Sequence, residues 1–132
     1  MKRIYKPIET PLGIANGRDA IYLDKVVFLN RTNTLVLEID LNTALCHRIS
    51  ESDVIDFSNF LLTFDQVLAT KQVELDSWDW ESESSFDEIQ DSEWIRELGG
   101  KVTSEYKHFL IQTYDDVFEV VCKNYEFAPN NT

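Results

Sequence analysis

A strict alternation in residues 35–41 constrains the fold more than any other feature of the chain. Every second position is aliphatic, and these positions are Leu35, Leu37, Ile39 and Leu41. A period of two places such side chains on one face of a β-strand. Residues 20–29, rich in β-branched and aromatic types, precede this run, and the turn-forming residues 30–33 separate the two. We therefore expect an antiparallel hairpin that turns one aliphatic face toward the core.

A second hairpin is predicted in residues 52–75, where the pattern has two interpretations. Residues 60–64 alternate, the pair Asp65-Gln66 can form a turn, and residues 67–75 alternate again. The competing interpretation is a helix over residues 53–70, because apolar side chains also recur there at helical spacing. These side chains are Val54, Phe57, Leu61, Phe64 and Leu68. The β-branched and polar positions of the second half favour the hairpin.

The C-terminal part predicts a third hairpin. Residues 106–113 and 117–127 flank a turn at residues 114–116. Phe118, Val120 and Cys122 then share one strand face, which makes Cys122 a core residue.

One short helix is expected near residues 92–98. Ser92 is a favourable N-cap, and Gly99-Gly100 is a favourable stop. The preceding residues 76–93 are acidic and serine-rich, with no Lys or Arg, and are predicted to form a loop.

The prediction is a single, mainly β domain over residues 1–132. Residues 1–19 are expected to form an extended arm or loop, with a short edge strand at residues 4–8. The antiparallel hairpins then form a sandwich or a partly open barrel. If residues 53–70 are helical, the fold is α+β instead.

The charge distribution indicates which classes of partner to expect. The chain has 24 acidic and 12 basic residues, a net charge of −12. Residues 1–50 carry seven basic and five acidic residues, a net of +2, whereas residues 51–132 carry five and 19, a net of −14. Such a field repels nucleic acid and anionic membranes, and it attracts a basic protein. An acidic surface that only maintains solubility is the simpler explanation.

The N-terminus and the cysteines indicate the cytosol. Residues 1–10 contain no unbroken apolar run of the roughly 7–15 residues that a signal peptide needs. Cys46 and Cys122 are the two cysteines of the chain, and we expect both to be free, buried thiols in a reducing compartment.

No catalytic, cofactor-binding or metal site is predicted, so the chain is expected not to be an enzyme. Cys46 and His47 are adjacent, but neighbours on a strand point to opposite faces. Together with His108 and Cys122, they lack the close pairs that zinc sites use. The acids near Asp76 lack the glycine of a calcium-binding loop. The glycines form neither a phosphate-binding loop nor a nucleophile elbow.

The strongest candidate for a binding surface is the acidic and aromatic stretch of residues 74–94, which holds all three tryptophans of the chain. Tryptophan is costly to leave exposed and is common at interface hot spots. The candidate partner-binding residues are Glu74, Asp76, Trp78, Asp79, Trp80, Glu81, Glu83, Asp87, Glu88, Asp91 and Glu93, assisted by Asp115, Asp116 and Glu119. The alternative is that the aromatic rings pack inward and leave the acids as a solvated rim.

Three functional hypotheses follow. The leading one is a non-catalytic interaction domain that binds a basic protein partner, in one version an immunity or inhibitor protein. The second is a small-ligand-binding module or weak hydrolase at the mouth of a β-barrel, with His47, His108 or Tyr106 as polar groups. The third is a structural homo-oligomer in which hairpin edges pair.

Overall fold

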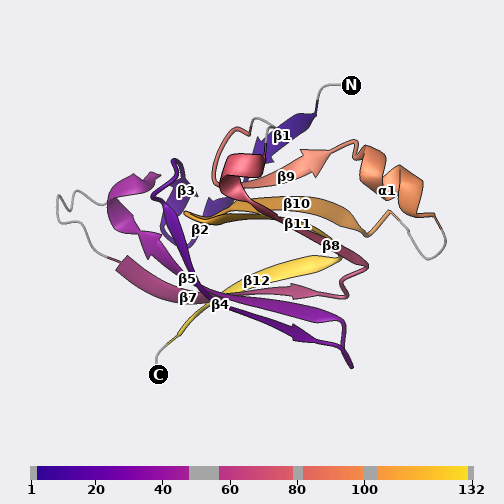
Figure 1. The fold of residues 1–132 in the computed structure, drawn as a ribbon, viewed down its shortest axis with the longest axis horizontal. Coiled ribbons are helices and arrows are strands. Elements are labelled where there is room, and N and C mark those ends of the chain that lie inside the picture. Colours follow the sequence, from indigo (N-terminus) through magenta and orange to yellow (C-terminus); the bar gives the residue numbers. More distant parts are fainter. Residues whose placement is uncertain (1–2, 48–56, 79–81, 100–103, 131–132) are drawn as a thin grey trace.

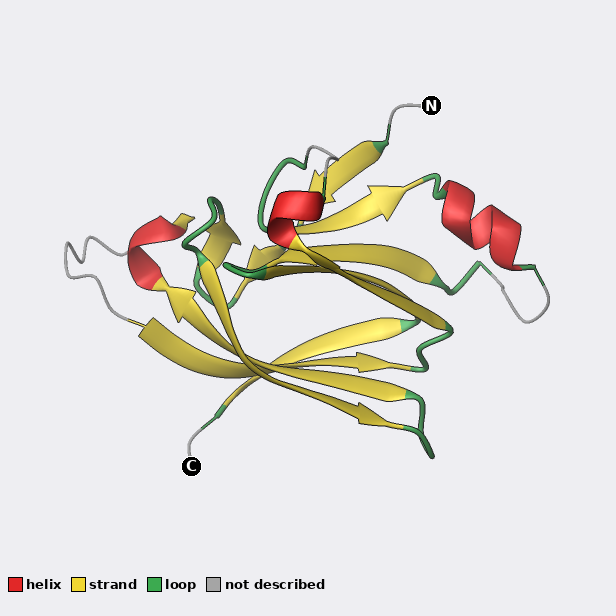
Figure 2. Ribbon diagram, viewed as in Figure 1, coloured by secondary structure: helices red, strands yellow, loops and turns green. Residues whose placement is uncertain are grey.

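Two antiparallel sheets face each other across one apolar core (Figures 1 and 2). The computed structural model describes residues 3–47, 57–78, 82–99 and 104–130. Within these residues, every strand pairing is antiparallel and neither sheet closes into a barrel. The arrangement confirms the expected mainly β, sandwich-like fold.

The first sheet, called the β10 sheet below, has strand β10 at its centre, paired with β11 in a hairpin. Its strands, in spatial order, are β1 (Ile4–Pro7), β9 (Phe86–Gln90), β10 (Lys107–Gln112), β11 (Asp116–Cys122) and β8 (Ala69–Glu74). The second sheet, called the β5 sheet, has the order β12 (Asn124–Pro129), β7 (Phe57–Asp65), β5 (Thr34–Asn42) and β4 (Ile21–Leu29).

Short elements connect and cover the two sheets. A small sheet contains β2 (Glu9–Thr10), β3 (Gly13–Ala15) and β6 (Cys46–His47). Two 3₁₀ turns, η1 (Thr43–Leu45) and η2 (Leu75–Ser77), and the helix α1 (Glu93–Leu98) complete the described elements. Helix α1 follows the end of β9 and lies beyond one end of the β10 sheet (Figure 1).

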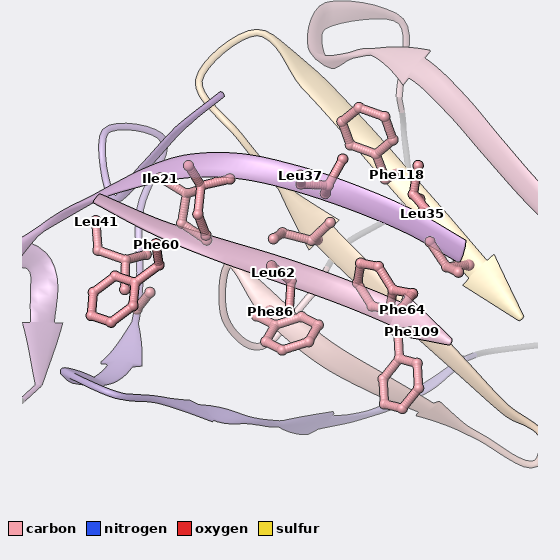
Figure 3. Packing of buried hydrophobic residues seen from close by; sticks show 14 of the residues in the cluster. Ile21, Leu35, Leu37, Leu41, Phe60, Leu62, Phe64, Phe86, Phe109 and Phe118 are labelled. Atoms are coloured by element: carbon pink, nitrogen blue, oxygen red, sulfur yellow. The ribbon is translucent and has the colours of Figure 1, made fainter. Parts of the chain in front are cut away.

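Aromatic rings from both sheets fill the core (Figure 3). Phe86 is fully buried, and its ring lies 6.3 Å from Phe64 and 6.1 Å from Phe109, measured between centroids. The alternating face of β5 points into the same core, as predicted, because Leu35, Leu37, Ile39 and Leu41 are all buried. These side chains supply the apolar area that holds the two sheets together.

The first hairpin and the helix are confirmed. Strands β4 and β5 pair around a turn in which Asn33 has a φ of 51°, a conformation that Asn tolerates. The hydroxyl of Ser92 accepts a hydrogen bond from the Ile95 amide at 3.1 Å and so caps α1. Gly99 ends the helix with a φ of 56°. The edge strand expected in residues 4–8 is also present, as β1.

The second hairpin is wrong in its pairing, although both strands exist. Strand β7 pairs with β5 and β12, whereas β8 pairs with β11 in the other sheet. The chain crosses between sheets at Val67 and Leu68, whose amides bond to the carbonyls of Asn33 and Val121 at 2.8 Å each. The helix alternative is wrong for the strand residues of β7 and β8, while residues 53–56 lie outside the described part.

Two other boundaries differ from the prediction. The third hairpin pairs β10 with β11, but the chain then returns to the β5 sheet at Lys123, where β12 begins a new pairing with β7. Phe118, Val120 and Cys122 are buried in the core, as predicted. The predicted loop of residues 76–93 contains β9, because Phe86 and Ile89 anchor it to the interior despite the acids between them.

Candidate functional site

Exposed aromatic rings form the first candidate, at the end of the molecule where β4, β7 and the β10–β11 turn meet. The ring of Tyr22 stacks on that of Tyr114, with 5.1 Å between centroids, and meets Phe57 edge-on at 5.4 Å. Phe57 is 47% exposed and Tyr114 is 37% exposed. The Tyr114 amide bonds to the carbonyl of Ile21 at 2.8 Å, which fixes the turn against β4.

Several carboxylates come from the turn that holds Tyr114 and from the adjacent ends of β8 and β11. Glu74 and Asp116 face each other directly across β8 and β11. The carbonyl of Asp115 accepts a hydrogen bond from the Leu75 amide at 2.9 Å, next to Asp76. Like charges in direct cross-strand register destabilise a sheet. The Glu74 carboxylate also caps η2 by accepting a hydrogen bond from the Asp76 amide at 2.7 Å.

One arginine joins the rings to the acids. Arg18 lies 3.5 Å from the Asp76 carboxylate, and its guanidinium carbon is 4.9 Å from the centre of the Tyr114 ring. The pKa of Tyr22 is raised, first by loss of water around its hydroxyl and then by the negative charge of Asp19, with a further contribution from Asp115. We call the following residues the tyrosine–carboxylate surface: Tyr22, Phe57, Glu74, Asp76, Tyr114, Asp115 and Asp116.

Two predicted partner-binding acids are not on the surface, which corrects the prediction. Asp87 is fully buried and accepts hydrogen bonds from the Glu83 amide, the Ser84 amide and the Ser84 hydroxyl at 3.0, 3.1 and 2.5 Å. Glu119 is 2% exposed and binds His108 and Arg3. Neither carboxylate can meet a partner in this conformation, because both are held inside by donors of the chain.

The described tryptophans pack at least partly inward. Trp78 is half-buried and contacts a small apolar cluster of Ile89, Leu110 and Val117 on the outer face of the β10 sheet. Trp94 is half-buried too, and its ring lies edge-on to His108 at 5.2 Å. These contacts match the alternative in which the rings fix the 74–94 segment to the sheet.

The remaining predicted residues are divided among several places. Glu83, Asp91 and Glu93 are exposed, and Glu88 is half-buried. Asp91 forms an ion pair with Arg96 at 2.5 Å. Asp79, Trp80 and Glu81 lie outside the described residues. The surface that the structure assembles therefore uses Glu74, Asp76, Asp115 and Asp116 from the predicted set, with tyrosines in place of tryptophans.

A buried polar chain on the outer face of the β10 sheet is the second candidate. The Ser92 hydroxyl lies 2.7 Å from Nδ1 of His108, and Nε2 of His108 lies 2.8 Å from the Glu119 carboxylate. The guanidinium of Arg3 contacts the same carboxylate oxygen at 3.0 Å. Ser92, His108 and Glu119 come from the cap of α1, from β10 and from β11.

The charges of Glu119 and Arg3 set the direction of the hydrogen bonds between Ser92, His108 and Glu119. Burial alone would raise the pKa of Glu119, but the hydrogen bond from His108 and the charge of Arg3 bring it down to about 2. Burial lowers the pKa of His108, so the imidazole is neutral at pH 7. An ionised carboxylate only accepts, so Nε2 carries the imidazole proton. Nδ1 is then the acceptor, and the Ser92 hydroxyl donates to it.

A pocket of about 190 Å³ opens beside the hydrogen-bonded Ser92 and His108 side chains. Ser92 and His108 form part of its wall, together with Arg3, Lys71, Asp91 and Trp94. The Lys71 ammonium nitrogen lies 4.8 Å from the centre of the Trp94 ring. A hydroxyl, an imidazole and a cation therefore meet in one concave space.

Sequence reasoning missed this second candidate, although part of its signal was present. On sequence alone, His108 is treated as a possible metal ligand or pocket group and Glu119 as a surface acid, and the two are not linked. In the observed β10–β11 hairpin, however, His108 and Glu119 lie on the same outer face as diagonal neighbours, because His108 pairs with Val121 and Glu119 pairs with Leu110. Polar side chains on a face that also holds Leu110 and Val117 indicate a buried network rather than a solvated one.

The cysteines do not take part in either candidate. Cys46 and Cys122 are free and buried, as expected. Burial raises the pKa of the Cys46 thiol, and it raises that of Cys122 to about 12. Both sulfurs are thiols at neutral pH and are poor nucleophiles. For His47, the structure describes only the backbone, which pairs with Ile14 of β3.

Neither a metal-binding cluster nor a membrane-spanning helix is present in the described parts of the chain. There, no three His, Cys, Asp or Glu side chains are close enough together to hold a metal ion. No helix among the described residues has the length and hydropathy to cross a membrane.

No protein-family model, no curated protein and no solved structure matches this chain.

Proposed function

We propose that this chain is a protein-interaction domain that binds a basic protein through its tyrosine–carboxylate surface. The observation that carries the proposal is the direct opposition of Glu74 and Asp116 next to the β10–β11 turn, whose exposed Tyr114 ring stacks on Tyr22. Opposed carboxylates weaken the sheet, and a cationic partner would relieve that repulsion. The encounter takes place in the cytosol, where free thiols persist.

The two kinds of residue have separate roles in this proposal. The carboxylates, within a chain of net charge −12, speed the approach of a basic surface. The aromatic rings supply the apolar contact that holds it, since tyrosine is enriched at interface hot spots. An immunity or inhibitor protein that masks a basic toxin or nuclease is one activity of this kind.

A charge-matched comparison tests the proposal. The surface variant combines Glu74→Gln, Asp76→Asn, Asp115→Asn and Asp116→Asn. The control combines Glu9→Gln, Asp24→Asn, Glu97→Gln and Glu126→Gln, which neutralises four exposed carboxylates elsewhere. Each variant loses four negative charges, so a difference in binding between them reports where the charges lie rather than the net charge of the protein. Glu74→Gln retains an oxygen that can accept from the Asp76 amide, as Glu74 does at 2.7 Å.

The immobilised proteins are incubated with lysate of the source cells, and the retained proteins are identified by mass spectrometry. We expect a basic protein to bind wild type and control, and to be lost by the surface variant. Raising the salt from about 50 mM to about 500 mM should also release it, because screening shortens the range of the attraction. Equal retention by all three proteins at both salt concentrations would overturn the proposal.

A homo-oligomer is the second candidate, and one observation favours it. Strand β4 is an edge of the β5 sheet, and its Val26, Phe28 and Leu29 are all more than two-fifths exposed, at 41, 42 and 47%. Long apolar edges are ready to pair with another strand. Light scattering distinguishes this candidate, because Phe28→Lys would convert a dimer to a monomer and would leave capture of a basic protein unchanged.

A further inference from the structure

The hydrogen-bonded chain beside the pocket has the polarity of a nucleophile, a base and an orienting carboxylate. The Ser92 hydroxyl donates to Nδ1 of His108, and Nε2–H of His108 donates to Glu119, over 2.7 and 2.8 Å. An activated serine needs this order of donors, in which the base receives the hydroxyl proton while a third group fixes the ring.

Helix capping alone does not account for the arrangement. The cap uses the Ser92 oxygen as an acceptor, at 3.1 Å from the Ile95 amide, and Asn or Asp would serve that purpose equally well. The hydroxyl proton is the remaining group, and it is aimed at an imidazole that is 1% exposed. Both residues still line a pocket, so the pair is buried in the protein and open to a small ligand.

We propose that Ser92 and His108, positioned by Glu119, form an acyl-transfer site that hydrolyses small uncharged carboxylic esters. This activity lies outside the proposed protein-binding function and against the expectation from sequence that the chain is not an enzyme. It uses a different part of the molecule from the tyrosine–carboxylate surface.

The chemistry balances with water as the co-substrate. Ser92 Oγ attacks the ester carbonyl carbon, and its proton passes to Nδ1 of His108. The bond from the carbonyl carbon to the alcohol oxygen then breaks, and His108 returns that proton to the departing alcohol. Water, deprotonated by His108, attacks the acyl-serine, releases the acid and restores the Ser92 hydroxyl. Lys71 on the pocket wall provides a positive charge for the negative oxygen of each tetrahedral intermediate.

The size and lining of the pocket define the substrate class. About 190 Å³ is less than the roughly 300–1,000 Å³ of drug-sized ligand sites, so a short acyl chain fits. Ile4, Ile89 and Trp94 provide apolar wall. Asp91, Glu93 and Glu97 also line the pocket, and their charges disfavour anionic esters.

The test combines turnover with covalent labelling on the full chain. Hydrolysis of p-nitrophenyl acetate and p-nitrophenyl butyrate is followed by absorbance, and a fluorophosphonate probe is mapped by mass spectrometry. We expect turnover above the buffer rate and labelling at Ser92. Absence of both, or labelling confined to residues other than Ser92, would overturn the proposal.

Matched serine variants separate catalysis from folding. Ser92→Asn retains a cap acceptor and removes the nucleophile. Ser84→Ala is the control, because Ser84 is also buried and bonded to a carboxylate, that of Asp87, at 2.5 Å. Thermal melting checks that each variant is folded. We expect Ser92→Asn to fall to the buffer rate, with activity retained in Ser84→Ala. Wild-type turnover by folded Ser92→Asn would exclude the mechanism.

Glu119 is tested as a positioning residue through the pH profile. The charged groups facing His108 are Glu119 of β11, Arg3 before β1 and Lys71 of β8. Ester hydrolysis requires neutral His108, so its rate falls on the acid side of the His108 pKa. Glu119→Gln removes the charge that favours imidazolium, so the acid limb should move to lower pH while the rate drops by about 10²-fold or more. An unchanged limb and rate would contradict this role.

Discussion

The two faces of the β10 sheet bury different kinds of side chain, although they belong to the same three strands. On the inner face, β9, β10 and β11 contribute Phe86, Phe109 and Phe118 to the core between the sheets. On the outer face, they contribute Asp87, His108 and Glu119, none more than 2% exposed. The inner face stabilises the fold through apolar area, and the outer face through specific hydrogen bonds and ion pairs.

A few side chains that pack over the polar outer face of the β10 sheet make it part of the protein interior. Trp78 and Leu75 pack over Ile89, Leu110 and Val117, and Trp94 of α1 packs against His108. Water is thereby excluded from groups that must satisfy one another. Such a face is sensitive to the loss of one partner in a way that the inner face is not.

The largest expected effect is on the inner face. Phe86→Ala removes a fully buried ring that contacts Phe64 and Phe109, and should lower the free energy of unfolding by about 3–5 kcal/mol. Urea denaturation measures the loss. Phe28→Ala is the control, since Phe28 is 42% exposed, and we expect a change within about 0.5 kcal/mol. Equal losses in the two variants would mean that the core is not where the structure places it.

Breaking the outer face should have the next largest effect. Glu119→Ala leaves His108 and Arg3 without the carboxylate that both contact, and should lower the free energy of unfolding by about 2–3 kcal/mol. The effect is smaller than in the core because the Arg3 side chain is 18% exposed and water can reach part of it. Chemical denaturation at pH 7 gives the value, and a loss below that of a surface substitution would show that the face is solvated.

Acid should weaken the outer face through Glu119. Its pKa is lowered from 4.5 to about 2 in the folded chain, so the ionised form stabilises the fold. That stabilisation is complete above pH 4.5 and is lost as the pH falls toward 2. His108, whose pKa is lowered from 6.5, adds a loss that begins below pH 6.5. Urea titrations of wild type and Glu119→Gln should therefore converge with falling pH, and parallel curves would contradict the assignment.

The smallest expected effect lies on the exposed surface. Arg18 and Asp76 form an ion pair with side chains 51% and 72% exposed, so Arg18→Ala should change the free energy of unfolding by less than about 1 kcal/mol. The same substitution also frees the face of the Tyr114 ring. Thermal melting measures the stability change, and a loss as large as that of Glu119→Ala would place this pair among the buried interactions.

Much of the local structure could be predicted from sequence because its signals are local. The alternation of residues 35–41, the turn near Asn33 and the Ser92 cap each depend on neighbours within a few positions. Strand β9 was missed because Asp87 and Glu88 suggest solvent. The 19 acids of residues 51–132 also concealed the distinction between Asp87 and Glu119, which are buried, and Asp115, which is exposed.

The sequence by itself determined which segments are extended, where the short helix begins and which face of residues 35–41 is apolar. Only the tertiary structure decided that β7 and β8 belong to different sheets, and that Ser92, His108 and Glu119 meet at one pocket. The physical reason is the distance along the sequence over which each interaction acts. Periodicity and capping act between near neighbours, whereas strand partners and buried hydrogen bonds are chosen by which distant surfaces can exclude water together.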